Sequence, residues 1–206
     1  MYVVGITGSI AMGKSTIATM LAKMGVPVHD ADKSVHDLFK KGGEAIPLIQ
    51  TVFPETITPI GVNRRLLSQV VFNEPAKLTQ LEDIVHPLVA KKRKEFLHLN
   101  KRNKVRLVAL DVPLLFETGG GAYCTNVLVV TAPRYLQHRR ALARPGMTEA
   151  KLKAILARQV PDFEKRKRAD YVVPTGLGRA YSQKVLRRVL NAIKENAIKN
   201  TNRRRS

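Results

Sequence analysis

The feature that most constrains the fold of this chain is the stretch Gly8-Ser9-Ile10-Ala11-Met12-Gly13-Lys14-Ser15 near the N-terminus. An apolar, β-branched run at residues 2–7 precedes it and predicts a buried strand. A helical pattern of apolar residues starts at Lys14 and ends at Gly25. A strand, a glycine turn and a helix in this order gather backbone N–H groups at a helix N-terminus. The stretch therefore predicts a phosphate-binding loop.

The residues of this loop have expected roles in binding a nucleoside triphosphate with Mg²⁺. Gly8 and Gly13 let the backbone turn so that its N–H groups face phosphate oxygens. Lys14 is expected to reach the β- and γ-phosphates, and the Ser15 hydroxyl to ligate Mg²⁺. Thr16 offers a further hydroxyl and N–H to the nearer phosphates. The predicted ATP-binding set also includes Ala11 and Met12.

Continuous apolar runs elsewhere predict a parallel sheet. Uninterrupted rather than alternating apolar residues indicate strands that are covered on both faces. The further strands are expected at residues 26–32, 106–112, 126–132 and 170–175. Helical patterns fall between or after them, at about 135–143, 148–159 and 179–198. This alternation predicts an α/β fold with a phosphate-loop core of about five parallel strands flanked by helices.

One interval is too long for a simple crossover. Residues 33–104 hold several helical patterns, prolines as punctuation at positions 54, 59, 75 and 87, and no convincing strand pair. We interpret it as a helical insertion that binds the acceptor. The nucleotide-binding core then comprises residues 1–32 and 105–206, with a helical lid at about 134–150.

Three acids stand where predicted strands end. Asp30 and Asp32 are two residues apart, so in an extended segment both could point to the same side. One of them could orient an acceptor hydroxyl and take its proton, or Asp32 could cap the next helix. Asp111 follows an apolar strand and could hold Mg²⁺, or it could be a turn residue before Pro113.

A basic helix is expected within the lid. Arg139, Arg140 and Arg144 lie on it, and the last two are four residues apart and so share a face. Two guanidinium groups on one face suit phosphate binding, although the face could also simply be solvated. Pro145 and Gly146 could form the hinge of a lid that excludes water from the transferred phosphate.

Charge is distributed unevenly along the chain. Residues 1–90 contain eight basic and eight acidic side chains, whereas residues 91–206 contain 28 basic and eight acidic ones and carry the whole net charge of +20. A polyanionic partner is expected. Nucleic acid is the less favoured one, because aromatic residues for base stacking make up only 5% and none is Trp. The tail from Asn200 has no apolar periodicity and is expected to be frayed.

The cellular compartment can be predicted from apolar runs, the N-terminal residues and the cysteine count. The sequence has no run of 18 apolar residues, so it predicts no membrane span. It also shows no basic leader of the kind that starts a signal peptide, so none is expected. A single cysteine, Cys124, forms no internal disulfide. We expect a cytoplasmic protein, with a monomer favoured.

The whole set of motifs is more specific than the loop alone. The chain resembles the dephospho-coenzyme A kinases in "GITGSI…GKST", "VHDAD", "NRRLLSQVVF", "IVHPLV", "LDVPLLFETG", "RRALARPGM" and "ARQVPDFEKRKRADYVV". The resemblance implies transfer of the ATP γ-phosphate to the ribose 3′-hydroxyl of dephospho-coenzyme A. Another small-molecule or nucleotide kinase, or a nucleic-acid-binding phosphate-loop protein, is the alternative.

The resemblance also assigns residues. It implies that Asp32 is the base, that Arg140 is the lid arginine, and that the acceptor side includes Arg64, His86 and Pro87. Ala11 departs from the family pattern, which usually has glycine there. A positive φ at that position would cost alanine on the order of 1 kcal/mol.

Overall fold

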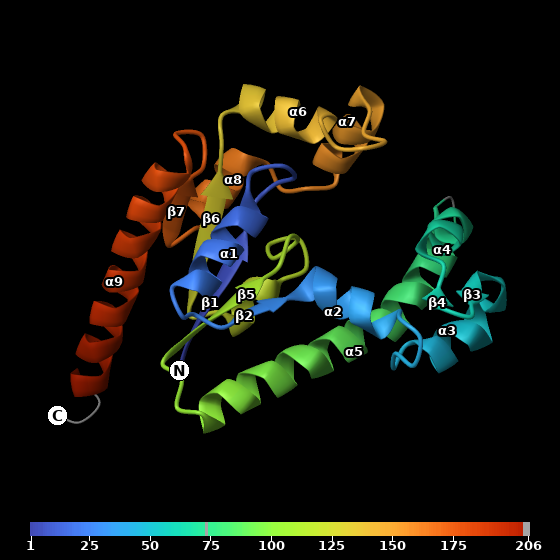
Figure 1. The fold of residues 1–206 in the computed structure, drawn as a ribbon, viewed down its shortest axis with the longest axis horizontal. Coiled ribbons are helices and arrows are strands. Elements are labelled where there is room, and N and C mark those ends of the chain that lie inside the picture. Colours follow the sequence, from blue (N-terminus) through green and yellow to red (C-terminus); the bar gives the residue numbers. More distant parts are fainter. Residues whose placement is uncertain (73, 204–206) are drawn as a thin grey trace. The chain divides into compact units, whose positions relative to one another are not determined.

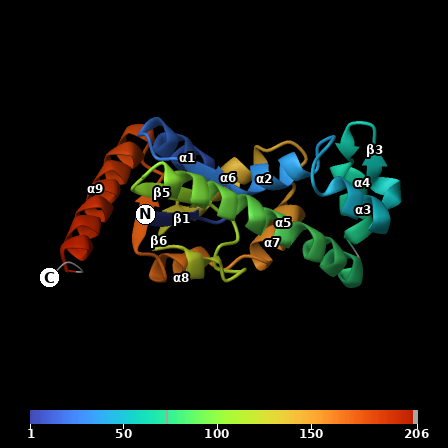
Figure 2. The same cartoon turned by 90° about the horizontal axis from the view of Figure 1, so that it is seen from below.

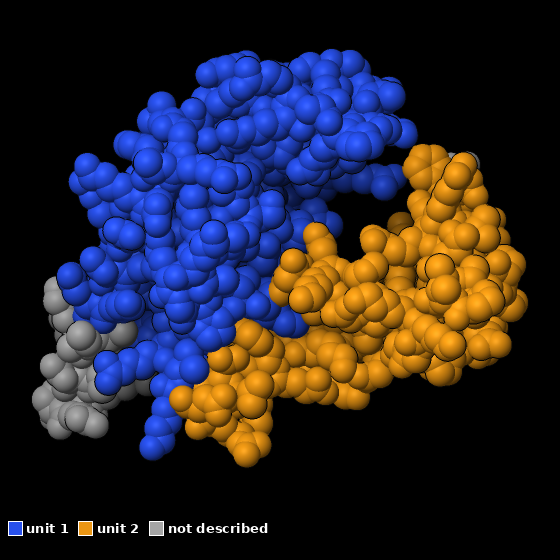
Figure 3. Space-filling view, viewed as in Figure 1, with its two compact units in different colours: residues 1–29, 104–206 blue, residues 30–103 orange. Residues whose placement is uncertain are grey.

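The computed structural model describes residues 1–72 and 74–203. They form two compact units, coloured separately in Figure 3. Unit 1 comprises residues 1–29 and 104–206, and unit 2 comprises residues 30–103. Each unit has its own hydrophobic core. The predicted assignment of these ranges to nucleotide and acceptor binding stays a prediction.

Unit 1 is built on a five-stranded parallel sheet, as the sequence predicts. Its strand order is β2-β5-β1-β6-β7, with β1 in the centre. Parallel pairing joins β1 to β5, β1 to β6 and β6 to β7. The strands are β1 (Tyr2–Thr7), β2 (Val28–Asp30), β5 (Leu107–Asp111), β6 (Asn126–Thr131) and β7 (Tyr171–Pro174).

Helices cover both faces of this sheet (Figures 1 and 2). Helices α1 (Lys14–Lys23) and α9 (Arg179–Arg203) pack on one face, where Ile17 and Leu186 are fully buried among the strand side chains. The short helix α8 (Asp162–Lys167) lies on the opposite side from α1, beside β6 (Figure 2). Burial on both faces explains why the strands have continuous apolar sequences.

Two further helices follow β6, and the first of them with the start of the second falls in the segment at about 134–150 that is predicted as a lid. They are α6 (Arg134–Leu142) and α7 (Glu149–Ala157), which contact each other. Ala141 and Leu152 are buried between them and pack against Ala11 of the loop. Helix α8 was not expected from the sequence. Pro161 precedes its first residue and has the fixed φ that suits a helix start.

Unit 2 is mainly helical. It contains α2 (Ala31–Leu38), α3 (Ile46–Val52), α4 (Arg64–Val71), the 28-residue helix α5 (Pro75–Arg102) and the short 3₁₀ helix η1 (Pro54–Thr56). The expectation of no strand pair is wrong. The two-residue strands β3 (Ile57–Thr58) and β4 (Gly61–Val62) pair antiparallel as a hairpin. Strands this short leave no detectable alternation in the sequence.

Two other expectations are corrected. Pro87 does not interrupt α5, which continues through it. Leu81, Val85 and Leu88 pack into the core of unit 2 on both sides of Pro87, and this packing offsets the lost backbone hydrogen bond. At the C-terminus, α9 extends past Asn200 to Arg203, so the segment expected to be frayed is helical as far as Arg203. Residues 204–206 lie outside the described residues.

Candidate active site

The phosphate loop has a backbone that only particular residues can form. Gly13 has a φ of 92°, in the left-handed region that favours glycine. A Cβ atom at Gly8 would lie 2.5 Å from the carbonyl oxygen of Val130, so any side chain there would collide with β6. Helix α1 begins at Lys14, directly after this turn. The loop therefore presents its backbone at a helix N-terminus, as expected for a phosphate site.

Ala11 also has a left-handed backbone, with a φ of 61°. For an L-residue other than glycine this conformation costs roughly 1–2 kcal/mol. The methyl group is buried against Ala141 and Leu152, which recovers part of that cost. The position at which the resemblance implies glycine thus does have a positive φ here.

Lys14 and Asp111 form an ion pair beside the loop. The Asp111 side chain is 4% exposed and ends β5, whereas that of Lys14 is 18% exposed. A carboxylate and the hydroxyl of Ser15 are hard oxygen ligands of the kind that Mg²⁺ prefers. Within the described residues, no group of three or more His, Cys, Asp or Glu side chains could hold a metal alone.

Arg140 does not project from the lid helix into solvent. Its guanidinium group donates to the Thr175 hydroxyl at 3.0 Å and to the Thr175 carbonyl at 2.9 Å. The Thr175 hydroxyl in turn donates to the carbonyl of Met12 at 2.6 Å. The lid arginine is thus joined to the phosphate loop through one buried threonine.

The expected pairing of Arg140 with Arg144 on a helix face is wrong. Helix α6 ends at Leu142, and Arg144 lies beyond it in the turn that leads to Pro145 and Gly146. Arg144 is exposed. The helix ends early because the chain turns at Gly146, whose φ is 70°, before α7 begins.

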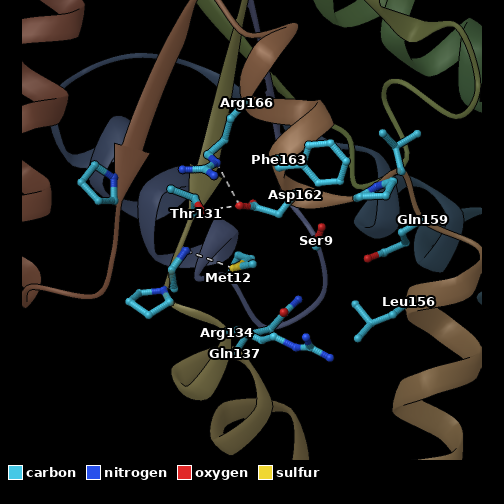
Figure 4. A pocket seen from close by; sticks show the side chains of 15 residues that line it. Ser9, Met12, Thr131, Arg134, Gln137, Leu156, Gln159, Asp162, Phe163 and Arg166 are labelled. Atoms are coloured by element: carbon cyan, nitrogen blue, oxygen red, sulfur yellow. Dashed lines mark hydrogen bonds and ion pairs between the residues drawn. The ribbon is translucent and has the colours of Figure 1, made fainter.

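A cavity of about 660 Å³ adjoins the loop in unit 1 (Figure 4). Ser9 and Met12 form one wall, and Gln137 reaches it from α6 and Gln159 from the segment after α7. Phe163 supplies an aromatic side, and the charged lining residues are Arg134, Asp162 and Arg166. Asp162 accepts the hydroxyl of Thr131 at 2.8 Å and pairs with Arg166. The cavity is therefore a mixed apolar and charged space next to the loop.

A buried ion pair lies near this cavity. Lys165 is fully buried and its Nζ lies 2.8 Å from Glu117 Oε1, which also accepts the backbone N–H of Val160. Burial raises the pKa of Glu117, but the hydrogen bonds from Lys165 and Val160 outweigh it and hold that pKa below its ordinary value. This pair fixes α8 and the cavity wall at Val160.

The acids of unit 2 differ from the expected extended pair. Asp30 ends β2 and caps α2, because its carboxylate accepts the backbone N–H of Lys33 at 2.9 Å. Asp32 lies within the first turn of α2. The two side chains therefore do not share one side of an extended strand, and the capping acid is Asp30 rather than Asp32. Asp32 is exposed and makes no side-chain hydrogen bond within the described part of the chain.

The other acceptor-side residues lie on two helices of unit 2. Arg64 is the first residue of α4, which is capped by the side chain of Asn63. His86 and Pro87 are in the middle of α5. All three are exposed, and no hydrogen bond or ion pair joins Arg64 to His86 in the described residues.

Sequence reasoning missed Thr175, Gln137 and Gln159, all of which bond to the loop. For Thr175 a signal existed, since a polar residue directly after a parallel strand lies at the ligand-binding edge of such a sheet. The two glutamines carry no comparable signal, because their partner is the backbone of Ile10.

Comparisons with known proteins agree with one another. The profile of the dephospho-CoA kinase family matches residues 2–177. A dephospho-CoA kinase of Paramagnetospirillum magneticum is 52% identical over 166 residues, which cover 81% of this chain and 78% of that protein.

Two solved structures are also similar. The crystal structure of TT1252 from Thermus thermophilus has a TM-score of 0.80 at 34% identity and covers 93% of this chain and 96% of its own. Dephospho-CoA kinase from Campylobacter jejuni has a TM-score of 0.64 at 25% identity, with 93% and 96% covered. The phosphate loop, the parallel sheet and these matches lead to one conclusion: the chain belongs to the dephospho-CoA kinase family.

Proposed function

We propose that the loop Gly8–Ser15 binds ATP with Mg²⁺ and that the γ-phosphate passes to the ribose 3′-hydroxyl of dephospho-CoA. The chain is a kinase that converts dephospho-CoA to coenzyme A, as membership of the family indicates. The observation that carries the site assignment is the ion pair of Lys14 with the buried Asp111 directly beside the loop. A cation and a carboxylate held together there suit a triphosphate with its metal.

On the donor side, the backbone N–H groups of the loop and the N-terminus of α1 hold the phosphates. Lys14 would leave Asp111 for the β- and γ-phosphates and stabilise the charge that develops during transfer. Ser15 and Asp111 would hold Mg²⁺, which neutralises phosphate charge when bound. Thr16 contributes a hydroxyl in the first turn of α1.

The lid contributes its arginines. Arg140 is positioned by Thr175 near the loop and would bind phosphate oxygens, with Arg144 as a second ligand in the turn after α6. Closure of residues 134–150 would exclude water and so favour the acceptor over hydrolysis.

On the acceptor side, Asp32 would orient the ribose hydroxyl and accept its proton as the new bond forms. An exposed carboxylate without a hydrogen-bond partner in the described residues is free for this role. Arg64, His86 and Pro87 would contact dephospho-CoA. Cationic and aromatic side chains suit its phosphates and adenine ring.

Location and assembly are also proposals. We place the protein in the cytoplasm as a monomer, where its substrates are small polyanions that the net charge of +20 attracts. No helix in the described residues is both long and apolar enough to cross a membrane.

A coupled ADP-release assay tests the function. Dephospho-CoA should support rapid ADP formation, whereas adenosine, nucleoside monophosphates or no acceptor should support little. Equal rates with a nucleoside monophosphate would favour a nucleotide kinase. Stimulation by a polynucleotide alone would favour a nucleic-acid-binding protein.

A further inference from the structure

The backbone of Ile10, in the middle of the phosphate loop, is held by two side chains. Its N–H donates to Gln159 Oε1 at 3.0 Å, and its carbonyl accepts from Gln137 Nε2 at 3.0 Å. Gln137 is only 6% exposed, so its amide has little access to water. Both hydrogen-bonding groups of one loop residue are therefore satisfied by protein, which fixes the orientation of the peptides that flank Ile10.

The partners determine how each amide group is oriented. A backbone N–H can only donate, so it must face the oxygen of Gln159, and a carbonyl can only accept, so it must face the nitrogen of Gln137. The two glutamines are thus not equivalent. One acts solely as an acceptor toward the loop and the other solely as a donor.

The two glutamines come from separate elements, one inside the predicted lid at about 134–150 and one beyond it. Gln137 lies in α6, and Gln159 lies after the end of α7. Figure 4 shows both beside the loop residues Ser9 and Met12. The loop that would bind the phosphates is therefore joined to the predicted lid through Gln137 and to the segment after α7 through Gln159.

We propose that Gln137 and Gln159 are positioning residues that hold the phosphate loop in its ATP-binding conformation through Ile10. They touch neither reacting group. They act by fixing a peptide so that the N–H groups of neighbouring loop residues stay directed at the phosphates. The proposal rests on the assignment of this loop as the ATP site.

Because Gln137 donates to the loop and Gln159 accepts from it, two glutamate variants can be compared that add the same charge but differ in the hydrogen bond they keep. Gln159→Glu keeps an oxygen that accepts the Ile10 N–H, whereas Gln137→Glu replaces the donor with a carboxylate that faces a carbonyl. Both variants add one negative charge to the same cavity, which Arg134, Asp162 and Arg166 also line. A difference between them therefore reports the hydrogen bond rather than the charge.

The experiment measures KM for ATP, KM for dephospho-CoA, kcat and thermal unfolding for both variants, for Gln137→Met and for Gln159→Met. We expect Gln137→Glu to raise KM for ATP about tenfold more than Gln159→Glu, because it leaves the partly buried carbonyl of Ile10 without its donor. Each methionine variant should raise KM for ATP by about tenfold. KM for dephospho-CoA should stay within about twofold in all four, and Gln50→Glu on the exposed face of α3 should match the wild type.

Two results would overturn the proposal. Equal KM for ATP in the two glutamate variants would show that the amide roles do not matter. Wild-type kinetics in both methionine variants would show the same even if a glutamate variant fails to fold.

Lys14→Ala distinguishes a failure of the ATP-site assignment from a failure of the role proposed for the glutamines. If that variant binds ATP normally, the loop is not the ATP site and both proposals fail. If only Lys14→Ala is impaired, the role of the glutamines alone is wrong.

Discussion

The phosphate loop of unit 1 and the acceptor-side residues of unit 2 are held in very different ways. In the loop, Gly8, Ala11 and Met12 are buried, and side chains of Gln137, Gln159 and Thr175 hydrogen-bond to its backbone. In unit 2, Asp32, Arg64 and His86 are exposed, and their side chains make no hydrogen bond or ion pair within the described residues.

This contrast is what the chemistry proposed for each region requires. Backbone donors lower a barrier only if their positions are fixed before the charge develops, so the loop must be rigid. Solvated side chains lose conformational entropy only when the substrate arrives, at about 0.5–1.5 kcal/mol for each long side chain. We therefore expect substitutions that disturb the backbone of the loop to change the protein already in its free state. Substitutions of the exposed residues in unit 2 should have an effect only once dephospho-CoA is bound.

The largest expected effect is that of Lys14→Ala. Removing the cation next to the transferred phosphate should lower the transfer rate at least about 100-fold. Steady-state ADP release with dephospho-CoA measures it, and circular dichroism checks that the chain still folds when Asp111 loses its ion pair with Lys14. Lys23→Ala in the last turn of α1 is the control and should change the rate by no more than about twofold. A Lys14→Ala rate within threefold of wild type contradicts the proposed role.

Asp32→Asn comes next, because it removes a base while keeping the shape of the side chain. Transfer should fall roughly 100-fold, with ATP affinity by calorimetry within a few-fold of wild type. Asp30→Asn is the matched control, since asparagine also caps helices and should preserve α2. If Asp30→Asn is the crippled variant, or if Asp32→Asn loses ATP affinity instead, Asp32 is not the acceptor's base.

The arginines of the lid should have intermediate effects. Arg140→Ala should lower turnover about tenfold or more and change background ATP hydrolysis, because a phosphate ligand is lost. Arg144→Ala should have a smaller effect because Arg144 is exposed in a turn. Turnover and hydrolysis are measured separately, with and without dephospho-CoA. Unchanged kinetics in both variants would mean that these side chains only interact with solvent and Thr175.

The smallest effect is expected for Ala11→Gly. Glycine relieves a left-handed strain of roughly 1–2 kcal/mol, but it loses a buried methyl group and gains entropy in the unfolded chain, which together offset about the same amount. The free energy of unfolding should therefore change by no more than about 1 kcal/mol. Ala11→Val should instead destabilise by about 1–3 kcal/mol, because a branched residue resists a positive φ and crowds Ala141 and Leu152. Urea unfolding of both variants gives the comparison, and a more stable Ala11→Val would contradict it.

Sequence predicts the parts of this molecule that depend on local pattern. The strand Tyr2–Thr7 and helices α1 and α6 lie within one or two residues of their predicted bounds, because each has a long apolar run or a clear start and stop. The loop was found because its glycines and Lys14 are a fixed local order of residues.

What the sequence did not predict depends on partners far along the chain. Gln159 lies 149 residues from Ile10, and Thr175 lies 163 residues from Met12, so no local pattern links them. The 3.6-residue spacing placed Arg140 and Arg144 on one face on the assumption that the helix includes both. The observed helix α6 ends at Leu142, two residues before Arg144. For Asp30 and Asp32, the strand ended sooner than expected, and capping moved to the earlier acid.

Pro87 within α5 has a consequence for how that long helix opens. Proline has no amide hydrogen, so the carbonyl of Asp83 lacks its helical partner and the ladder is interrupted near the middle. Backbone amides in the turn on either side of Pro87 should therefore exchange with solvent deuterium sooner than those near Leu97. A helix that is continuous in its backbone path would then behave as two independently protected halves, with the break beside His86.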